Sequence, residues 1–261
     1  ELNASVVPFD QLDEHLGHRE ALCAEAEALA ASEGDPAALS EAFHGIEERW
    51  REAESLPVPN RAAAALNQRW SEARRAVLRR ERELAGQTRR AALSLLARQA
   101  VICESLERAL ESGALTEDKA AAAQAAWLEL PRQTEADLQR RIENRFRAAV
   151  AALGSGGGAP RTPLSENARR RAELCLHLEI LAQVDSPPEN SQARLAFQVD
   201  RLKEHMRAGE KDPLGDASRL LEDWYLCGPA PAAVAPGLEK RFRRALSALE
   251  RDEGEIGLHD A

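Results

Sequence analysis

The chain has 261 residues, of which 44% are hydrophobic, 4% aromatic and 30% charged, and its formal net charge is −9. This length supports one large core or several small ones, and the hydrophobic content is too high for a disordered chain. No apolar run approaches the roughly 18 to 20 residues of a membrane span. Abundant Ala, Leu, Glu and Arg with few aromatics favours helices, so we predict an all-α protein with no membrane partner.

The number of cysteines bears on the cellular compartment, and the first residue bears on whether the sequence is part of a longer protein. Four cysteines are too few for a disulfide framework, which favours a reducing cytoplasm. The sequence begins with Glu1 and shows no charged-then-apolar leader, so we expect it to be the C-terminal part of a longer protein.

The first predicted helical repeat spans residues 1–86. One helix carries Cys23 with Glu27 four residues later, and a second helix ends between Trp50 and a proline turn. A third helix places five apolar residues on one stripe at spacings of 4, 4, 3 and 4. These residues are Ala62, Leu66, Trp70, Ala73 and Val77.

The second predicted repeat, residues 87–153, shows the same order of signals. Cys103 is followed by Glu107, and Trp127 precedes a second proline turn. The stripe then recurs as Leu138, Ile142, Phe146, Ala149 and Leu153. Only Gly86 weakens the helical pattern between the first two repeats, so we predict that one helix runs from the first repeat directly into the second.

The third predicted repeat spans residues 164–252 and follows a glycine-rich flexible linker, residues 154–163. Its anchors are Cys175, Glu179 and Trp224, and the stripe is Val234, Leu238, Phe242, Ala245 and Leu249. The longer distance between its cysteine and tryptophan predicts an inserted helix around residues 192–207. Residues 253–261 are predicted to be a disordered tail. The whole chain is expected to form an elongated array of three-helix repeats.

An arginine precedes the aromatic residue of each stripe, at Arg69, Arg145 and Arg241. One interpretation pairs each of these arginines with the repeated glutamate, at Glu27, Glu107 and Glu179, which would tie the first helix of each repeat to the third. A catalytic pair of carboxylates would need a second acid at the same place, and the spacing shows none.

These repeated motifs resemble the bacterial family catalogued as domain of unknown function number 349. The resemblance rests on the Leu-Cys-x-x-x-Glu helix, the tryptophan before a proline turn and the Leu-x-x-Arg-Phe-x-x-Ala helix, and it covers most of residues 18–250. Residues 173–182 match best and resemble the C-terminal portion of the family. The resemblance implies tandem all-helical modules in long cytosolic proteins, and it implies no catalytic residue.

The repeated cysteines Cys23, Cys103 and Cys175 are separated by 80 and 72 residues, whereas zinc ligands come in closely spaced pairs. We therefore interpret them as core residues. His15 and His18 have helical spacing but no further ligand nearby. We predict no catalytic, cofactor-binding or metal site. The aromatic anchors are interpreted as core rather than as base-stacking platforms; they are Trp50, Trp70, Trp127, Phe146, Trp224 and Phe242.

Charge is distributed unevenly along the chain. Residues 1–60 carry a net charge of −11, residues 61–171 carry +8, and residues 172–261 carry −6. The densest basic segment is a candidate surface for an anionic partner; its residues are Arg74, Arg75, Arg79, Arg80, Arg82, Arg89 and Arg90. A solvated helix face is the alternative interpretation.

Two hypotheses about function follow. The favoured one is a non-enzymatic scaffold or adaptor that binds an unknown protein partner through exposed helix faces, with no small-molecule substrate. The other is association with RNA or another polyanion through the arginine-rich helices of residues 61–171, which would make binding strongly salt-dependent.

Overall fold

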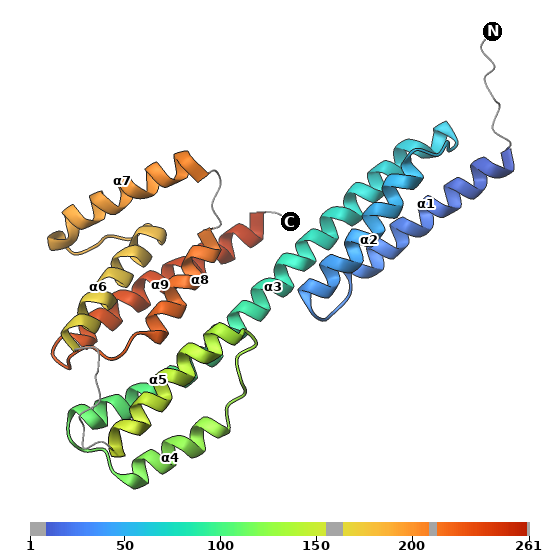
Figure 1. The fold of residues 1–261 in the computed structure, drawn as a ribbon. Coiled ribbons are helices and arrows are strands. Elements are labelled where there is room, and N and C mark those ends of the chain that lie inside the picture. The colour runs from blue at the N-terminus through green and yellow to red at the C-terminus, as the bar shows by residue number, and fades with distance from the viewer. Residues whose placement is uncertain (1–8, 155–163, 209–212, 260–261) are drawn as a thin grey trace. The chain divides into compact units, whose positions relative to one another are not determined.

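The computed structural model describes residues 9–154, 164–208 and 213–259, and helices are the only regular elements in these ranges (Figure 1). The all-α expectation is confirmed. The chain divides into two compact units, Glu1–Arg90 and Ala91–Ala261. The boundary therefore lies inside one long helix, four residues after the predicted end of the first repeat.

The first unit contains α1 (Phe9–Ala30), α2 (Pro36–Glu54) and the first part of α3 (Asn60–Glu111). Helix α2 begins where the sequence supplies a start signal: Asp35 accepts a hydrogen bond from the Ala38 N–H, and a proline occupies the first turn. The three helices enclose one core, in which the predicted stripe of α3 is buried from Leu66 to Val77.

Helix α3 is continuous across the boundary, as the sequence predicted. It ends because Gly113 adopts a left-handed conformation, with φ at 66°. There the Ala114 N–H donates to the Ala109 carbonyl and the Gly113 N–H donates to the Leu110 carbonyl, which is the bonding of a Schellman cap.

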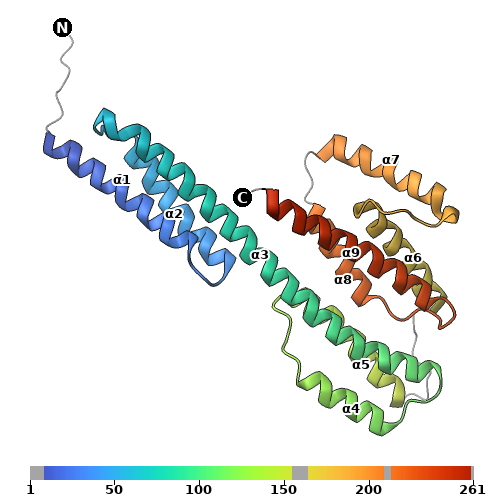
Figure 2. The same ribbon diagram turned by 180° about the vertical axis from the view of Figure 1, so that it is seen from behind.

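The second unit holds the rest of α3 and six further helices within the described ranges (Figure 2). They are α4 (Glu117–Leu128), α5 (Ala136–Gly154), α6 (Leu164–Leu181), α7 (Ser191–Ala208), α8 (Pro213–Leu226) and α9 (Ala235–His259), with a 3₁₀ turn at Pro188–Asn190 before α7. Helix α7 matches the predicted insertion to within one residue at each end.

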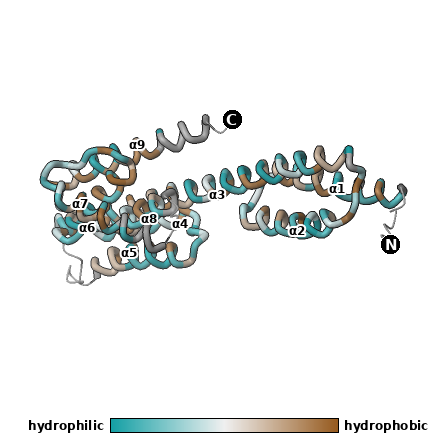
Figure 3. The backbone as a smooth tube through the Cα atoms, turned by 90° about the horizontal axis from the view of Figure 1, so that it is seen from above, coloured by the Kyte–Doolittle hydropathy of each residue, from teal (hydrophilic) through white to brown (hydrophobic). Residues whose placement is uncertain are grey.

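Two hydrophobic cores lie inside this unit. One joins α3, α4 and α5 around Ile142 and Phe146, and the other joins α6, α8 and α9 around Leu178 and Phe242. Tyr225 packs against both cores. Hydrophobic and hydrophilic stretches alternate along the helices (Figure 3), as expected for helices that bury one face.

Three expectations need correction or qualification. The sequence pattern places Val234 on the buried stripe, but it is 45% exposed, because α9 begins one residue later and Val234 belongs to the preceding turn.

Helix α9 continues to His259, so residues 253–259 are helical rather than a disordered tail, and Ile256 follows Leu249 at the helical spacing of seven. Residues 155–163 of the predicted linker, residues 260–261 of the predicted tail and the side chain of Leu153 lie outside the described set.

Candidate functional site

Each repeated glutamate forms a two-bond ion pair with the arginine that precedes the stripe aromatic. In every pair the guanidinium donates through Nε and Nη2 to both carboxylate oxygens, at 2.6 to 3.0 Å. The pairs are Glu27–Arg69, Glu107–Arg145 and Glu179–Arg241. The predicted pairing is confirmed, and it ties the cysteine-bearing helix to the stripe-bearing helix three times.

The three ion pairs differ in burial. The side chains of Arg69 and Glu27 are 41% and 44% exposed, whereas those of Arg145 and Glu107 are 9% and 15% exposed. The difference arises because the end of α8 covers the Arg145 pair, and Arg145 Nη1 donates to the Tyr225 carbonyl at 2.6 Å. Burial acts to lower the pKa of Arg145, but the hydrogen bonds and charge of Glu107 outweigh it and the pKa is raised.

The six aromatic anchors stack in pairs, one pair for each predicted repeat. Ring centroids are 4.0 to 4.4 Å apart and the planes are within 11° of parallel. The pairs are Trp50–Trp70, Trp127–Phe146 and Trp224–Phe242. Because one face of each ring is covered by its partner, this arrangement favours packing over base stacking.

The three repeated cysteines are fully buried core residues. Burial raises the pKa of all three thiols, and it raises those of Cys103 and Cys175 to about 12. His15 Nδ1 lies 2.9 Å from the Pro57 carbonyl and thus joins α1 to the turn after α2. Across the described residues, no three His, Cys, Asp or Glu side chains gather where a metal ion could bind.

Sequence reasoning missed a buried polar residue that lies four positions before each repeated cysteine. These residues are Arg19, Gln99 and Arg171. Each donates to a main-chain carbonyl in the last turn of the tryptophan helix or just after it: Arg19 to Ala53, Gln99 to Pro131 and Arg171 to Cys227. Donors at a helix C-terminus satisfy its free carbonyls. The signal was available, because a polar residue recurs on an otherwise apolar face.

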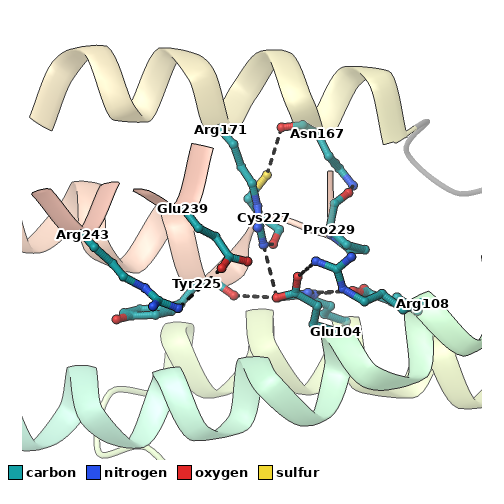
Figure 4. Close-up of polar contacts among 11 residues, drawn as sticks. Glu104, Arg108, Asn167, Arg171, Tyr225, Cys227, Pro229, Glu239 and Arg243 are labelled. Carbon is teal, nitrogen blue, oxygen red and sulfur yellow. Dashed lines mark hydrogen bonds and ion pairs between the residues drawn. The ribbon is translucent and has the colours of Figure 1, made fainter. Parts of the chain in front are cut away.

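In the second unit, Arg171 also reaches α3 (Figure 4). Its Nη2 lies 3.4 Å from Glu104 Oε2 and 3.4 Å from the Cys227 carbonyl. Glu104 accepts a shorter bond of 2.7 Å from Arg108. Burial acts to raise the pKa of Glu104, but Arg171 and Arg108 outweigh it and the pKa is lowered. Arg171 therefore connects the helices of the second predicted repeat to those of the third.

A groove of about 230 Å³ opens beside Arg171, between α3, α8 and α9. Glu104, Glu239 and Arg243 contribute polar atoms to its lining, and Figure 4 shows these residues along α3 and α9. Its larger apolar lining residues are Val101, Trp224, Tyr225, Phe242 and Leu246. The guanidinium carbon of Arg171 lies 4.7 Å from the Trp224 ring centroid, and Arg171 Nε is buried without an acceptor. The groove thus combines aromatic walls with an unused buried donor.

The predicted basic surface lies on α3 within the first unit, and two of its arginines bond to other segments of that unit, one to α2 and one to the loop between α1 and α2. Arg74 donates to Glu47 at 2.7 Å, and Arg80 donates to the Ser32 carbonyl at 2.9 Å. Arg75 bonds only within its own helix. The remaining members make no hydrogen bond or ion pair to any described residue; they are Arg79, Arg82, Arg89 and Arg90.

A family model described as Domain of Unknown Function (DUF349) matches residues 10–59. The matched segment covers almost all of α1, the whole of α2 and the turn that precedes α3. This supports the family resemblance for the cysteine-bearing and tryptophan-bearing helices of the first unit. Neither the curated proteins nor the solved structures contain a match to the chain.

None of the helices described is both long enough and apolar enough to cross a membrane.

Proposed function

We propose that the protein is a non-enzymatic helical adaptor that binds another protein through the groove of the second unit. The observation that carries this proposal is the apolar groove with Val101, 67% exposed, among its lining residues. Exposed apolar surface next to aromatic walls favours protein binding. The repeated glutamates and cysteines support a non-enzymatic role, because they are engaged in holding helices together.

We also propose how the helices are organised into repeats. The three sets of stacked rings, ion pairs and buried cysteines support three tandem three-helix repeats. We extend the family resemblance to all three of them and propose that they form an elongated array. The chain would act in the bacterial cytoplasm as the C-terminal part of a longer protein, without a cofactor or a small-molecule substrate.

Affinity capture with matched variants tests the adaptor function. The full chain serves as bait with nuclease-treated lysate, beside Val101→Asp at the groove and Leu195→Asp on α7, where the side chain is 63% exposed. We expect specific proteins to bind the parent chain and Leu195→Asp but not Val101→Asp. Recovery of the same proteins by both variants, or of none after nuclease treatment, contradicts binding through the groove.

A second candidate function is association with RNA through α3. It is favoured by the guanidinium groups of Arg79, Arg82 and Arg90, which are exposed and have no described partner. Phosphate binding by such groups releases counterions, so affinity would fall steeply as salt rises.

A mobility-shift experiment separates the two candidates. Charge reversal at Arg79, Arg82 and Arg90 is the informative variant, because Arg74 and Arg80 also bond to other segments of the first unit. Arg219→Glu on α8, where the side chain is 82% exposed, is the matched control. We expect the triple variant to lose binding to a single-stranded RNA probe and the control to keep it. Absence of a shift by the parent chain at low salt excludes this function.

A further inference from the structure

We propose that the groove beside Arg171 binds the C-terminal residue of a partner protein, with the terminal carboxylate on the guanidinium and a large apolar side chain against the aromatic wall. This inference rests on the proposed adaptor function and specifies the chemistry of the partner. It is drawn from the unused hydrogen-bonding capacity of Arg171, the local balance of charge, and the size and lining of the groove.

Arg19 provides an internal reference for Arg171, because both lie four residues before a repeated cysteine and both approach the tryptophan of their own predicted repeat. Arg19 makes three hydrogen bonds to carbonyls, at 2.7 to 2.9 Å. Arg171 makes two contacts at 3.4 Å, beyond the usual range of about 2.7 to 3.2 Å. The Nε of Arg171 has no acceptor, whereas the Nε of Arg19 donates to the Ala53 carbonyl.

A buried guanidinium with weak contacts is costly unless another acceptor is supplied. Since only 3% of Arg171 is exposed, water reaches little of it. The long contacts to Glu104 and Cys227 also resist rotation of the guanidinium only weakly. An acceptor that enters the groove would therefore gain a strong hydrogen bond and give up little.

The two acids and two arginines that line the groove balance in number, but Glu104 also pairs with Arg108, so one cation is in excess around that carboxylate. Arg145 is matched by Glu107, and Arg243 is matched by Glu239 at 3.5 Å. Glu104 is shared between Arg108 and Arg171, at 2.7 and 3.4 Å. The complementary ligand group is accordingly an anion, and a planar carboxylate suits the guanidinium fork.

The remaining lining selects an apolar group. Val101, Trp224, Tyr225, Phe242 and Leu246 supply aliphatic and aromatic walls. The volume of about 230 Å³ is below the range of roughly 300 to 1,000 Å³ that is usual for small-molecule sites. It suits a single residue. A carboxylate and a large apolar side chain belong to one residue only when that residue ends a chain, which identifies the occupant as a C-terminus.

Titration of the full chain with defined peptides tests this proposal. The probe is N-acetylated Gly-Ala-Gly-Ala-Leu with a free C-terminal carboxylate, beside the same peptide as a C-terminal amide and beside octanoate. Binding is followed by the indole N–H resonance of Trp224, assigned by Trp224→Phe. We expect the free-acid peptide to shift this resonance and to bind at least tenfold more tightly than the amide.

Three variants distinguish recognition from folding. Arg171→Gln is expected to abolish the preference for the free acid, whereas Arg19→Gln keeps it. Val101→Asp places a carboxylate at an exposed position of the groove and is expected to weaken the free-acid peptide tenfold or more. It remains informative if Arg171→Gln fails to fold.

Equal binding of acid and amide, or no binding of either, overturns the inference. If a protein is nevertheless captured in a manner that depends on Val101, the adaptor function stands without terminal-carboxylate recognition. Binding of octanoate but of neither peptide makes the groove a small-molecule site, and thereby contradicts both the inference and the proposed function.

Discussion

The repeated Glu–Arg ion pair matters to the stability of the two units to different extents, because its burial differs between them. Glu27 and Arg69 meet in the first unit with over two-fifths of each side chain exposed, whereas Glu107 and Arg145 meet under the end of α8. Exposed ion pairs contribute little net stability, but removing one partner of a buried pair leaves a charge without compensation.

We therefore expect Arg145→Ala to destabilise the second unit by about 3 kcal/mol and Arg69→Ala to destabilise the first unit by less than about 1 kcal/mol. Arg145→Ala removes the partner of buried Glu107 and the donor to the Tyr225 carbonyl together. Urea unfolding of each full-length variant measures the difference. Equal losses would show that burial does not determine the importance of these pairs.

Thiol reactivity is a second property decided at single residues. Cys23, Cys103 and Cys175 are buried and burial raises their pKa values, so little reactive thiolate exists at pH 8. We expect iodoacetamide to leave these three cysteines unmodified in the native protein and to modify all four after unfolding in urea. Peptide mass spectrometry reads the sites, and rapid native labelling of Cys103 or Cys175 contradicts the packing described.

At the scale of elements, the described side chains attach α7 through two sets of contacts. The rings of His177 on α6 and Phe197 on α7 stack at 3.9 Å. Arg194 donates to the Val184 carbonyl at 2.8 Å and to Ser186 Oγ at 2.7 Å. Among the described side chains, a titratable ring and an arginine thus contribute to the attachment of this helix.

Acidification is expected to loosen α7. Burial lowers the pKa of His177, and Arg170 lowers it further while Glu173 opposes the shift. Because the folded pKa lies below the unfolded value of about 6.5, this stability is complete above pH 6.5 and is lost as the pH falls through the folded pKa.

Hydrogen exchange of the amides of α7, corrected for the intrinsic effect of pH, measures that change between pH 7.5 and 5. His177→Phe keeps an aromatic ring against Phe197 and removes the titration, so its α7 should show no pH-dependent loosening. A variant that loosens as much as the parent chain would exclude His177 as the cause.

At the scale of the whole molecule, two compact units share one helix. The first unit has a single core around Trp50 and Trp70, whereas the second unites the cores around Phe146 and Phe242 through the contacts of Tyr225. A boundary inside α3 means that cooperative unfolding of one unit can leave the helical residues of the other in place.

We expect two separable unfolding transitions. Trp50→Ala removes a buried ring from the first core and Trp224→Ala removes one from the second, each at a cost of about 3 to 5 kcal/mol. Each substitution should lower the midpoint of its own unit alone, as followed by hydrogen exchange in residues 9–90 and 91–259 during a urea series. A single transition moved by both variants contradicts two cooperative units.

Local chemistry made much of this fold predictable from sequence. The positions of the helices, the proline turns after Trp50, Trp127 and Trp224, the uninterrupted α3 and the inserted α7 follow from periodicity and from start and stop signals over a few residues. The Glu–Arg pairs were also predictable, because a repeated acid and a repeated base recur at matched helical positions.

Tertiary structure alone decided the rest. Arg171 meets Glu104 across 67 positions of sequence, and Arg145 meets Tyr225 across 80, so only the contact of α6 with α3 and the packing of α8 against α5 could reveal the groove and the deeply buried ion pair. The position of Val234 depended on where α9 begins. Periodicity determines which face of a helix is apolar, but the burial of a charge depends on which distant helix covers that face.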